Sequence, residues 1–382
     1  QLGDGTTSDH ILPEELASGV KEIAAGGFHS LFLKTDGTLW AMGYNIYGQL
    51  GDGTTTNRSS PVQVATGVAH VYSGPDVMFS LFLKTDGSLW AMGFNTSGNL
   101  GNGTTINQST PVQVATDVVN VAAGAGFSLF VKTDGTLWGM GSNSNGQLGG
   151  NHGSINVSPV QLATDVVNVA AGAAHSLFVK TDGTLWGMGR NAFGELGDGT
   201  TVGRLSPVQV ATGVRQVVAG DWHSLFVRTD GTAWAMGDNA DGVSGDGLPT
   251  GQSNPMGLAS NVKAMATNGD YSYFVKTDGT LWAMGPGSLG FLSAATGESF
   301  VPPHQVASGV SAVALGQSHC LILKTDGTLW GEGDNSSGQL GDGTTGSRNY
   351  FAQVSTGVAQ IAAVIFSSFF VKTDGTLWGM GN

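Results

Sequence analysis

The stretch Lys34-Thr35-Asp36-Gly37-Thr38-Leu39-Trp40 decides the fold, because close copies of it recur along the whole chain. The tryptophans that end these copies are spaced by 50 residues once and then by 48 residues six times: Trp40, Trp90, Trp138, Trp186, Trp234, Trp282, Trp330 and Trp378. A fixed period of this length is typical of a repeat architecture. Residues present in every unit serve geometry that all units share, whereas residues that differ between units are free to carry function.

One repeat contains four short β segments. In the third unit these are residues 118–124, 128–132, 137–141 and 159–163, which we name strands A, B, C and D. Asp134-Gly135 makes the B–C turn, since Asp can bond its own backbone and Gly supplies a positive φ. Pro159 suits the start of an edge strand. Four-stranded units repeated radially are the blades of a β-propeller, so the sequence predicts an all-β fold.

The two ends of the chain complement each other. Gln1-Leu2-Gly3-Asp4 is in phase with the C–D loop motif at 49–52, and the last unit stops at Asn382, soon after strand C. We therefore predict a closed propeller of eight four-stranded blades, in a single domain of residues 1–382. Strands A to C of the last blade come from 357–381 and strand D from about 11–16. Two ends that fall within a motif also indicate a piece of a longer polypeptide.

Each repeated tryptophan is predicted to lie wedged between neighbouring blades. Burial of one such side chain is worth roughly 2–3 kcal/mol by apolar area. The single Cys320 excludes an intrachain disulfide framework, and we expect it to be a small buried residue of strand B.

The motif at 26–51, Gly-x-x-His-Ser-Leu followed by Lys-Thr-Asp-Gly-x-Leu-Trp-x-x-Gly-x-Asn-x-x-Gly-Gln-Leu-Gly, resembles the regulator of chromosome condensation repeat. The resemblance covers essentially all 382 residues, and the chain looks like a bacterial member of this family. It implies a β-propeller, although that family commonly has seven blades. This chain also departs from the pattern at 285–290, where the loop motif is lost. Members of the family have unrelated functions, so the resemblance does not choose a function.

Composition limits the possible partners. The formal net charge is −13, and only seven basic residues lie outside the repeated position: Lys21, Arg58, Arg190, Arg204, Arg215, Lys263 and Arg348. This argues against nucleic acid, which is bound through Lys and Arg. No apolar run is long enough to span a membrane. Loops rich in Thr, Asn and Gly, with little Lys, favour an extracellular or cell-surface protein of a bacterium, either monomeric or part of a larger polypeptide.

Binding is predicted on one face of the ring. In a four-stranded meander the A–B and C–D loops emerge on one face, and the nearly invariant B–C turns emerge with the D–A turns on the other. Variable loops on a rigid scaffold are where binding usually occurs. Units eight, one and two supply an apolar arc: Ile365, Phe366, Phe28, Tyr44, Ile46, Tyr47, Met78 and Phe94. Units five and six supply an acidic arc around Trp222: Asp221, Asp238, Asp241, Asp246 and Asp270.

An aromatic anchor ringed by polar residues is the composition of an interface hot spot. We therefore predict partner-binding residues in both arcs: Trp222, Tyr44, Tyr47, Phe94, Ile365, Phe366, Asp221, Asp238 and Asp241.

Catalytic and metal-binding signals are weak. The position before strand B carries His29, His175, His223 and His319, but these lie in separate blades, whereas zinc ligands must converge on one point. A histidine at this offset also belongs to the family repeat that the chain resembles, which implies that each makes a hydrogen bond that braces its loop. The sequence at 141–145 lacks the last Gly of a Gly-x-Ser-x-Gly motif, and the Gly-Asp-Gly-Thr loops lack the ligand pattern of a calcium loop.

We therefore predict no catalytic residue, no metal and no cofactor. The sequence favours a non-enzymatic recognition scaffold that binds a protein partner through the A–B and C–D loops. One alternative is a carbohydrate-binding propeller in which Tyr44, Tyr47, Phe94 or Trp222 stacks on sugar rings. Another is a hydrolase that uses loop carboxylates such as Asp238 and Asp241.

Overall fold

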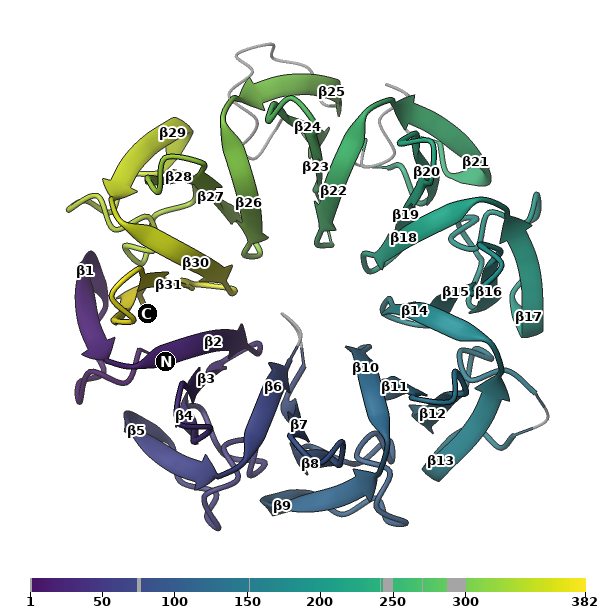
Figure 1. Ribbon diagram of the computed structural model, residues 1–382, viewed down its shortest axis with the longest axis horizontal. Helices are drawn as coiled ribbons and strands as arrows, with labels where there is room; N and C mark the ends of the chain where they lie inside the picture. The colour runs from purple at the N-terminus through teal and green to yellow at the C-terminus, as the bar shows by residue number, and fades with distance from the viewer. Residues whose placement is uncertain are drawn as a thin grey trace.

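The computed structural model describes residues 2–73, 77–150, 152–240, 242, 250–269, 271–286 and 300–382. These residues form eight four-stranded antiparallel sheets, which stand around a central opening like the blades of a propeller (Figure 1). The predicted eight-bladed all-β fold is therefore confirmed. The described part of the chain contains no helix, and hence none that is long and apolar enough to cross a bilayer.

Seven blades take their strands in chain order, A to D from the inside outward (Figure 1). Blade one consists of β2 (Val20–Ala25), β3 (His29–Lys34), β4 (Leu39–Gly43) and β5 (Arg58–Ala65), and blade two of β6 (Val68–Tyr72), β7 (Phe79–Lys84), β8 (Leu89–Gly93) and β9 (Gln108–Ala115). Blade three consists of β10 (Val118–Ala123), β11 (Phe127–Lys132), β12 (Leu137–Ser142) and β13 (Ile155–Ala163). Blade four consists of β14 (Val166–Ala171), β15 (His175–Lys180), β16 (Leu185–Gly189) and β17 (Arg204–Ala211). Blade five consists of β18 (Val214–Ala219), β19 (His223–Arg228), β20 (Ala233–Gly237) and β21 (Gln252–Ala259). Blade six consists of β22 (Val262–Thr267), β23 (Ser272–Lys276), β24 (Leu281–Pro286) and β25 (Phe300–Ala307). Blade seven consists of β26 (Val310–Leu315), β27 (His319–Lys324), β28 (Leu329–Gly333) and β29 (Arg348–Ser355).

The eighth blade closes the ring. It consists of β30 (Val358–Ala363), β31 (Ser367–Lys372) and β32 (Leu377–Gly381), with β1 (His10–Ala17) as the outer strand. β1 and β32 pair antiparallel, from His10 opposite Gly381 to Ala17 opposite Leu377. The first and last strands therefore share one sheet, as the sequence predicts.

The repeated heptapeptide builds the B–C turn and anchors the tryptophan. In blade one, Asp36 Oδ1 accepts hydrogen bonds from the Thr38 backbone N–H at 2.9 Å and from Thr38 Oγ1 at 2.6 Å. Trp40 Nε1 donates to Thr38 Oγ1 at 2.9 Å, and Lys34 Nζ lies 5.1 Å from the centroid of the Trp40 ring. Gly37 has a φ of 80°, which explains the glycine of the turn. The Asp, Thr, Trp and Lys side chains of the motif therefore make contacts that recur in each blade, with Ser88 replacing Thr in blade two and Arg228 replacing Lys in blade five.

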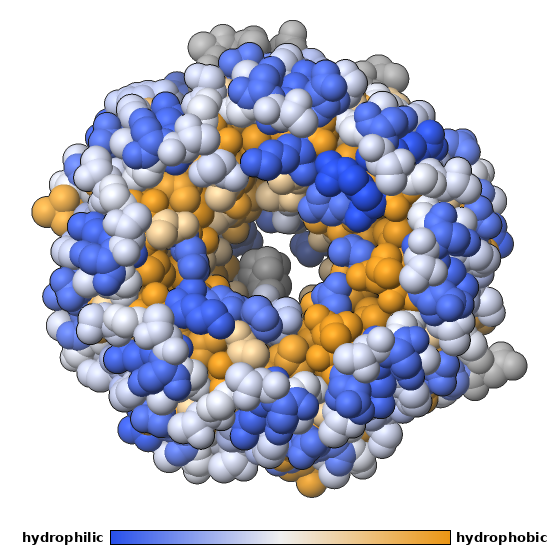
Figure 2. Space-filling view, in the orientation of Figure 1, coloured by the Kyte–Doolittle hydropathy of each residue, from blue (hydrophilic) through white to orange (hydrophobic). Residues whose placement is uncertain are grey.

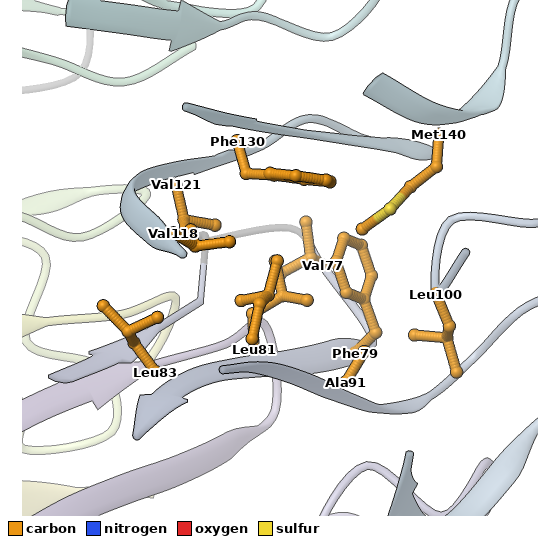
Figure 3. Packing of buried hydrophobic residues seen from close by; sticks show 11 residues of the cluster. Val77, Phe79, Leu81, Leu83, Ala91, Leu100, Val118, Val121, Phe130 and Met140 are labelled. Atoms are coloured by element: carbon orange, nitrogen blue, oxygen red, sulfur yellow. The ribbon is translucent and has the colours of Figure 1, made fainter. Parts of the chain in front are cut away.

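Apolar clusters fill the junctions between neighbouring blades. Between blades two and three, Leu81 and Phe79 meet Phe130 and Met140 (Figure 3). Trp138 lies at the edge of this cluster, partly buried and stacked on Phe130 with 6.5 Å between ring centroids. The tryptophan therefore lies at the blade junction, as predicted. Its side chain is buried less deeply than predicted, because Phe130, at 1% exposure, occupies the centre of the junction.

Strand D begins earlier than the sequence predicts. β13 starts at Ile155, so Pro159 lies inside the strand and not at its first residue. The register between β12 and β13 shifts between Gly139–Val160 and Gly141–Asn156. A bulge on an outer strand accommodates a proline because no ladder hydrogen bond is needed from its nitrogen.

Candidate functional site

Three of the predicted aromatic residues meet in one pocket on the loop face. Tyr47 and Phe94 lie edge to face with their ring centroids 5.1 Å apart, and Tyr44 lies 6.4 Å from Tyr47. Phe28 extends this row, 6.1 Å from Tyr44. With Met78, these rings line a cavity of about 380 Å³ above blades one to three, which we name the aromatic pocket.

The C–D loop of blade one is held by polar residues that recur in the loops of other blades, and this positions the tyrosines. Asn45 is fully buried, and its amide donates to Asp52 Oδ1 at 3.1 Å and to the Thr54 carbonyl at 3.2 Å. Gln49 Oε1 accepts from the Tyr47 backbone N–H at 3.1 Å. The repeated Asn and Gln thus fix the backbone, while the residues between them vary from blade to blade.

Gly93 allows loops of two blades to meet beside the pocket. Its φ is 106°, and a Cβ here would lie 2.8 Å from the Met78 carbonyl oxygen and 2.9 Å from Gln49 Cβ. Any larger residue would push the A–B loop of blade two away from the C–D loop of blade one. This glycine therefore brings Met78 and Phe79 into the wall of the aromatic pocket.

A polar cavity of about 300 Å³ adjoins the aromatic pocket and shares Phe28 and Tyr44 with it. Arg58 and Asn57 of blade one line it together with residues that precede β1. Arg58 is held by an ion pair to Asp52, with its Nη2 at 2.5 Å from Oδ2. The cavity therefore presents hydrogen-bonding groups beside aromatic rings.

Trp222 lies in a second aromatic group, above blades four and five. The Arg190 guanidinium is sandwiched between the Trp222 ring, at 4.0 Å, and the Phe193 ring, at 4.9 Å. Arg190 also approaches Glu195, with 3.7 Å between Nε and Oε1. The Asp238 backbone N–H donates to the Trp222 carbonyl at 2.8 Å. The acidic arc thus has a cation at its centre, which the sequence analysis did not assign to the site.

Asp221, the residue before Trp222, lines the mouth of the central channel. This cavity of about 200 Å³ is bordered mostly by alanines and glycines of the A–B turns, from blades two to seven. Figure 2 shows the central opening and a largely hydrophilic outer rim. Asp221 therefore connects the Trp222 group to the middle of the face.

Other predicted site residues do not join these groups. Ile365 is only 6% exposed, which leaves little of it for a partner to contact. Phe366, at 36%, is exposed but does not line the aromatic pocket. Asp241 lies outside the described residues, as do Asp246 and Asp270.

The four histidines brace the junctions between blades. The Nε2 atom of each lies 2.7–3.0 Å from the Oγ of the strand-B serine in the next blade: His29–Ser80, His175–Ser224, His223–Ser272 and His319–Ser368. Ser80 Oγ in turn donates to the Gln49 carbonyl at 2.9 Å, so the His29 Nε2–H donates to the serine. Burial lowers the pKa of His29 to about 4. The hydrogen bond of these histidines is structural, as predicted, but it joins two blades and does not brace the loop of the histidine itself.

Glu195 is a buried carboxyl beside Arg190 of the Trp222 group. It replaces the loop glutamine of other blades and accepts the same bond, from the Phe193 backbone N–H at 2.9 Å. Burial raises its pKa above the ordinary value for Glu, partly offset by hydrogen bonds and by Arg190. Its buried position and loop-bracing contact mark it as structural.

Comparison with known proteins places the chain in a family. The RCC1-like domain model matches residues 1–307, and the regulator of chromosome condensation (RCC1) repeat matches residues 310–339. The chain belongs to the RCC1-like domains. Human WBSCR16 is similar to this RCC1-like domain, with 21% identity and a TM-score of 0.68 over 90% of this chain and 97% of the other. Prp20p from Saccharomyces cerevisiae has 18% identity and a TM-score of 0.67, over 92% of each chain.

At these identities the solved structures support the shared fold of the RCC1-like domain alone. The site must therefore be argued from the residues of this chain. Ala125 of the aromatic pocket and Arg190 of the Trp222 group were missed as site residues. Phe79 also borders the aromatic pocket, but at 2% exposure it belongs to the junction of blades two and three. A signal existed for Arg190, which follows the strand-C motif where other blades carry Tyr, Phe, Ser, Asp, Pro or Asn.

Proposed function

We propose that this RCC1-like domain is a non-enzymatic recognition scaffold that binds a protein partner through the face bearing the A–B and C–D loops. The observation that carries the proposal is the aromatic pocket. Its rings come from variable loops of adjoining blades, whereas every repeated aromatic side chain is used in packing. Clustered aromatic residues in a concave surface are typical of interface hot spots. The yeast protein Prp20p binds Gsp1p and histones, which supports a protein-binding role for the family.

The proposal is tested by capture and calorimetry. Immobilised wild-type protein, Tyr47→Ala and Tyr350→Ala are exposed to extract of the native source, and retained proteins are quantified by mass spectrometry. Tyr350 is a matched control, because it is an exposed tyrosine (52%) on the outer strand β29. A protein retained by wild type and by Tyr350→Ala should be depleted on Tyr47→Ala.

Calorimetry with the purified partner then gives the size of the effect. Truncation of a hot-spot aromatic weakens binding by about 2 kcal/mol or more, which is roughly thirtyfold. Equal affinity of the wild type and Tyr47→Ala for every captured protein would refute a binding role for the aromatic pocket.

Carbohydrate binding is the second candidate function. The polar cavity that shares Phe28 and Tyr44 with the aromatic pocket favours it, since sugars are bound by aromatic rings beside hydrogen-bonding groups. A glycan array probed with wild type and Tyr44→Ala distinguishes the two functions. If the wild type binds a defined glycan and Tyr44→Ala does not, the result supports carbohydrate binding. If no glycan on the array is bound, the result favours a protein as the occupant of the aromatic pocket.

A further inference from the structure

Three cavities of the loop face adjoin one another. The polar cavity and the aromatic pocket share Phe28 and Tyr44, and the aromatic pocket shares Ala125 with the mouth of the central channel. A row of adjoining cavities thus leads from the boundary of blades eight and one, past the aromatic pocket, to the channel mouth that Asp221 lines. We name this row of cavities the face groove.

The described part of the loop side carries an excess of negative charge. On the opposite side each B–C turn balances one Lys or Arg at the end of strand B with one Asp. That side also carries three other basic residues near the start of strand A and three other carboxylates: Lys21, Arg215 and Lys263, with Glu22, Asp117 and Asp165. Among the described residues, the excess of carboxylates over basic residues therefore lies on the loop side and the outer strand.

The cations of the loop side are already matched. Each of its arginines lies within 4 Å of a carboxylate in its own C–D loop: Arg58 with Asp52, Arg190 with Glu195, Arg204 with Asp198 and Arg348 with Asp342. The described loop side holds more carboxylates than basic residues, Asp221 and Asp238 among them, so its net charge is negative. A surface of this sign attracts cationic groups.

The channel mouth has the chemistry to accept one cationic side chain. Asp221 is the acidic residue among its described lining residues, and none of these residues is Lys or Arg. The Asn268 amide braces the surrounding loops, since it donates to the Gly316 carbonyl at 2.7 Å and accepts from the Tyr271 backbone N–H at 2.8 Å. The remaining wall is built from alanine and glycine, so the entrance is not blocked by long side chains. A Lys or Arg that enters would lie close to the Asp221 carboxylate.

We propose that the face groove receives an extended segment of a basic partner protein, with a large apolar side chain in the aromatic pocket and a Lys or Arg at the channel mouth beside Asp221. This inference rests on the proposed function, because it uses the same face. It adds the chemistry of the partner: an apolar residue and a basic residue near one another on one strand or loop. Ala125 marks the place where the segment crosses from one cavity to the other.

The probe is a phage-displayed library of random 12-residue peptides, selected on the immobilised full chain. Selected sequences are synthesised with a fluorescent label, and their affinities are measured by fluorescence anisotropy. We expect enrichment of peptides that combine a large apolar residue with Lys or Arg. Their binding should weaken as NaCl is raised, because salt screens the attraction to the acidic face.

Three variants test the path of the segment. Tyr47→Ala should weaken binding at least roughly tenfold as a hot-spot truncation, and Asp221→Asn by several fold with a smaller salt dependence. Ala125→Arg places a long side chain at the crossing and should abolish binding. Ala125 is exposed, so this change leaves the blade junctions intact.

Matched controls lie on the opposite face. Asp165→Asn removes one charge at a D–A turn where another blade carries Asn261 with a similar positive φ. Ala359→Arg adds a cation at an exposed strand-A position that corresponds to Lys21 and Arg215. Both controls should bind the peptides as the wild type does.

The outcomes separate the two proposals. If Tyr47→Ala loses binding while Asp221→Asn and Ala125→Arg do not, the face binds partners but the proposed path along the face groove is wrong. Selected peptides that are acidic or wholly apolar would also overturn the groove. If the library yields no peptide whose binding depends on Tyr47, both the groove and the proposed use of the aromatic pocket fail.

Discussion

The turn side and the loop side of the ring both place a cation over tryptophan, but in different settings. On the turn side, every repeated tryptophan has a Lys or Arg 4.0–5.2 Å from its ring centroid, next to a blade junction. On the loop side, Arg190 lies 4.0 Å from Trp222 in loops whose sequence varies between blades. The same chemistry thus serves architecture where it is repeated, and is available for recognition where it occurs once. Substitutions on the two sides should therefore have different consequences.

The largest effect is expected at a blade junction. Phe130 is 1% exposed in the cluster between blades two and three, so Phe130→Ala should lower the free energy of unfolding by about 3–5 kcal/mol. Trp138, which is partly buried at the edge, should cost less on truncation, roughly 2 kcal/mol. Equilibrium denaturation in urea measures both. A Trp138→Ala cost equal to or above that of Phe130→Ala would show that tryptophan is the deep junction residue after all.

The second effect concerns pH and the junction histidines. Burial lowers the pKa of His175 to about 3, and those of His29, His223 and His319 to about 4. An unfolded histidine takes up its proton below about pH 6.5. Between pH 6.5 and pH 4 the unfolded state therefore binds more protons, and the free energy of unfolding should fall as the pH falls. The slope is up to about 1.4 kcal/mol per pH unit for each histidine.

His175→Phe is the matched test of that slope. In the junction of blades two and three, the position equivalent to this histidine already carries Phe79, and the equivalent serine, Ser128, still donates through Oγ to the Asn99 carbonyl at 2.9 Å. The variant should therefore fold, and its stability between pH 4 and pH 6.5 should depend less steeply on pH than that of the wild type. Urea denaturation at several pH values provides the comparison. An unchanged slope would mean that His175 is not held neutral by burial.

The smallest effect is expected on the loop side. Trp222→Ala removes a ring that stacks on Arg190 but fills no blade junction, so its cost to folding should be about 0.5–1 kcal/mol, the value of an exposed cation–π contact. The melting temperature should change little, while affinity for a loop-face partner should fall. If Trp222→Ala destabilises the protein as much as Trp138→Ala, Trp222 belongs to the architecture and not to the recognition surface.

The sequence predicts the blades well because each repeated residue performs the same local task eight times. Asp36, Gly37, Thr38 and Trp40 form contacts within a few residues of one another, so their spacing alone predicts the turn. The depth of a side chain is a different matter. Whether Phe130 or Trp138 lies deeper depends on the neighbouring blade, which sequence periodicity does not describe.

The candidate site was predicted in part. Tyr44, Tyr47 and Phe94 were assigned because aromatic residues in variable loops stand out from the repeat, and they do meet. Ile365 has the same signal but points inward, at 6% exposure. Ala125 does not stand out in the sequence, because alanine carries no functional group. Its importance comes from its position in the walls of two cavities. Shared walls between cavities follow from the arrangement of blades around the ring and cannot be read from one loop.

The pairing of β1 with β32 has a consequence for biosynthesis. Asp9 and Asn382, which hydrogen-bond at 2.9 Å, are 373 residues apart in the chain. At a synthesis rate of about 5–20 residues per second, the ribosome needs roughly 20–70 s to reach β32, the partner strand, after it has made β1. During that time the other blades can assemble from neighbouring segments, whereas Leu2 and Leu16 have no junction to enter. Closure of the ring is therefore a late, long-range step, and the nascent chain has to keep its first strand from pairing elsewhere until the last one emerges.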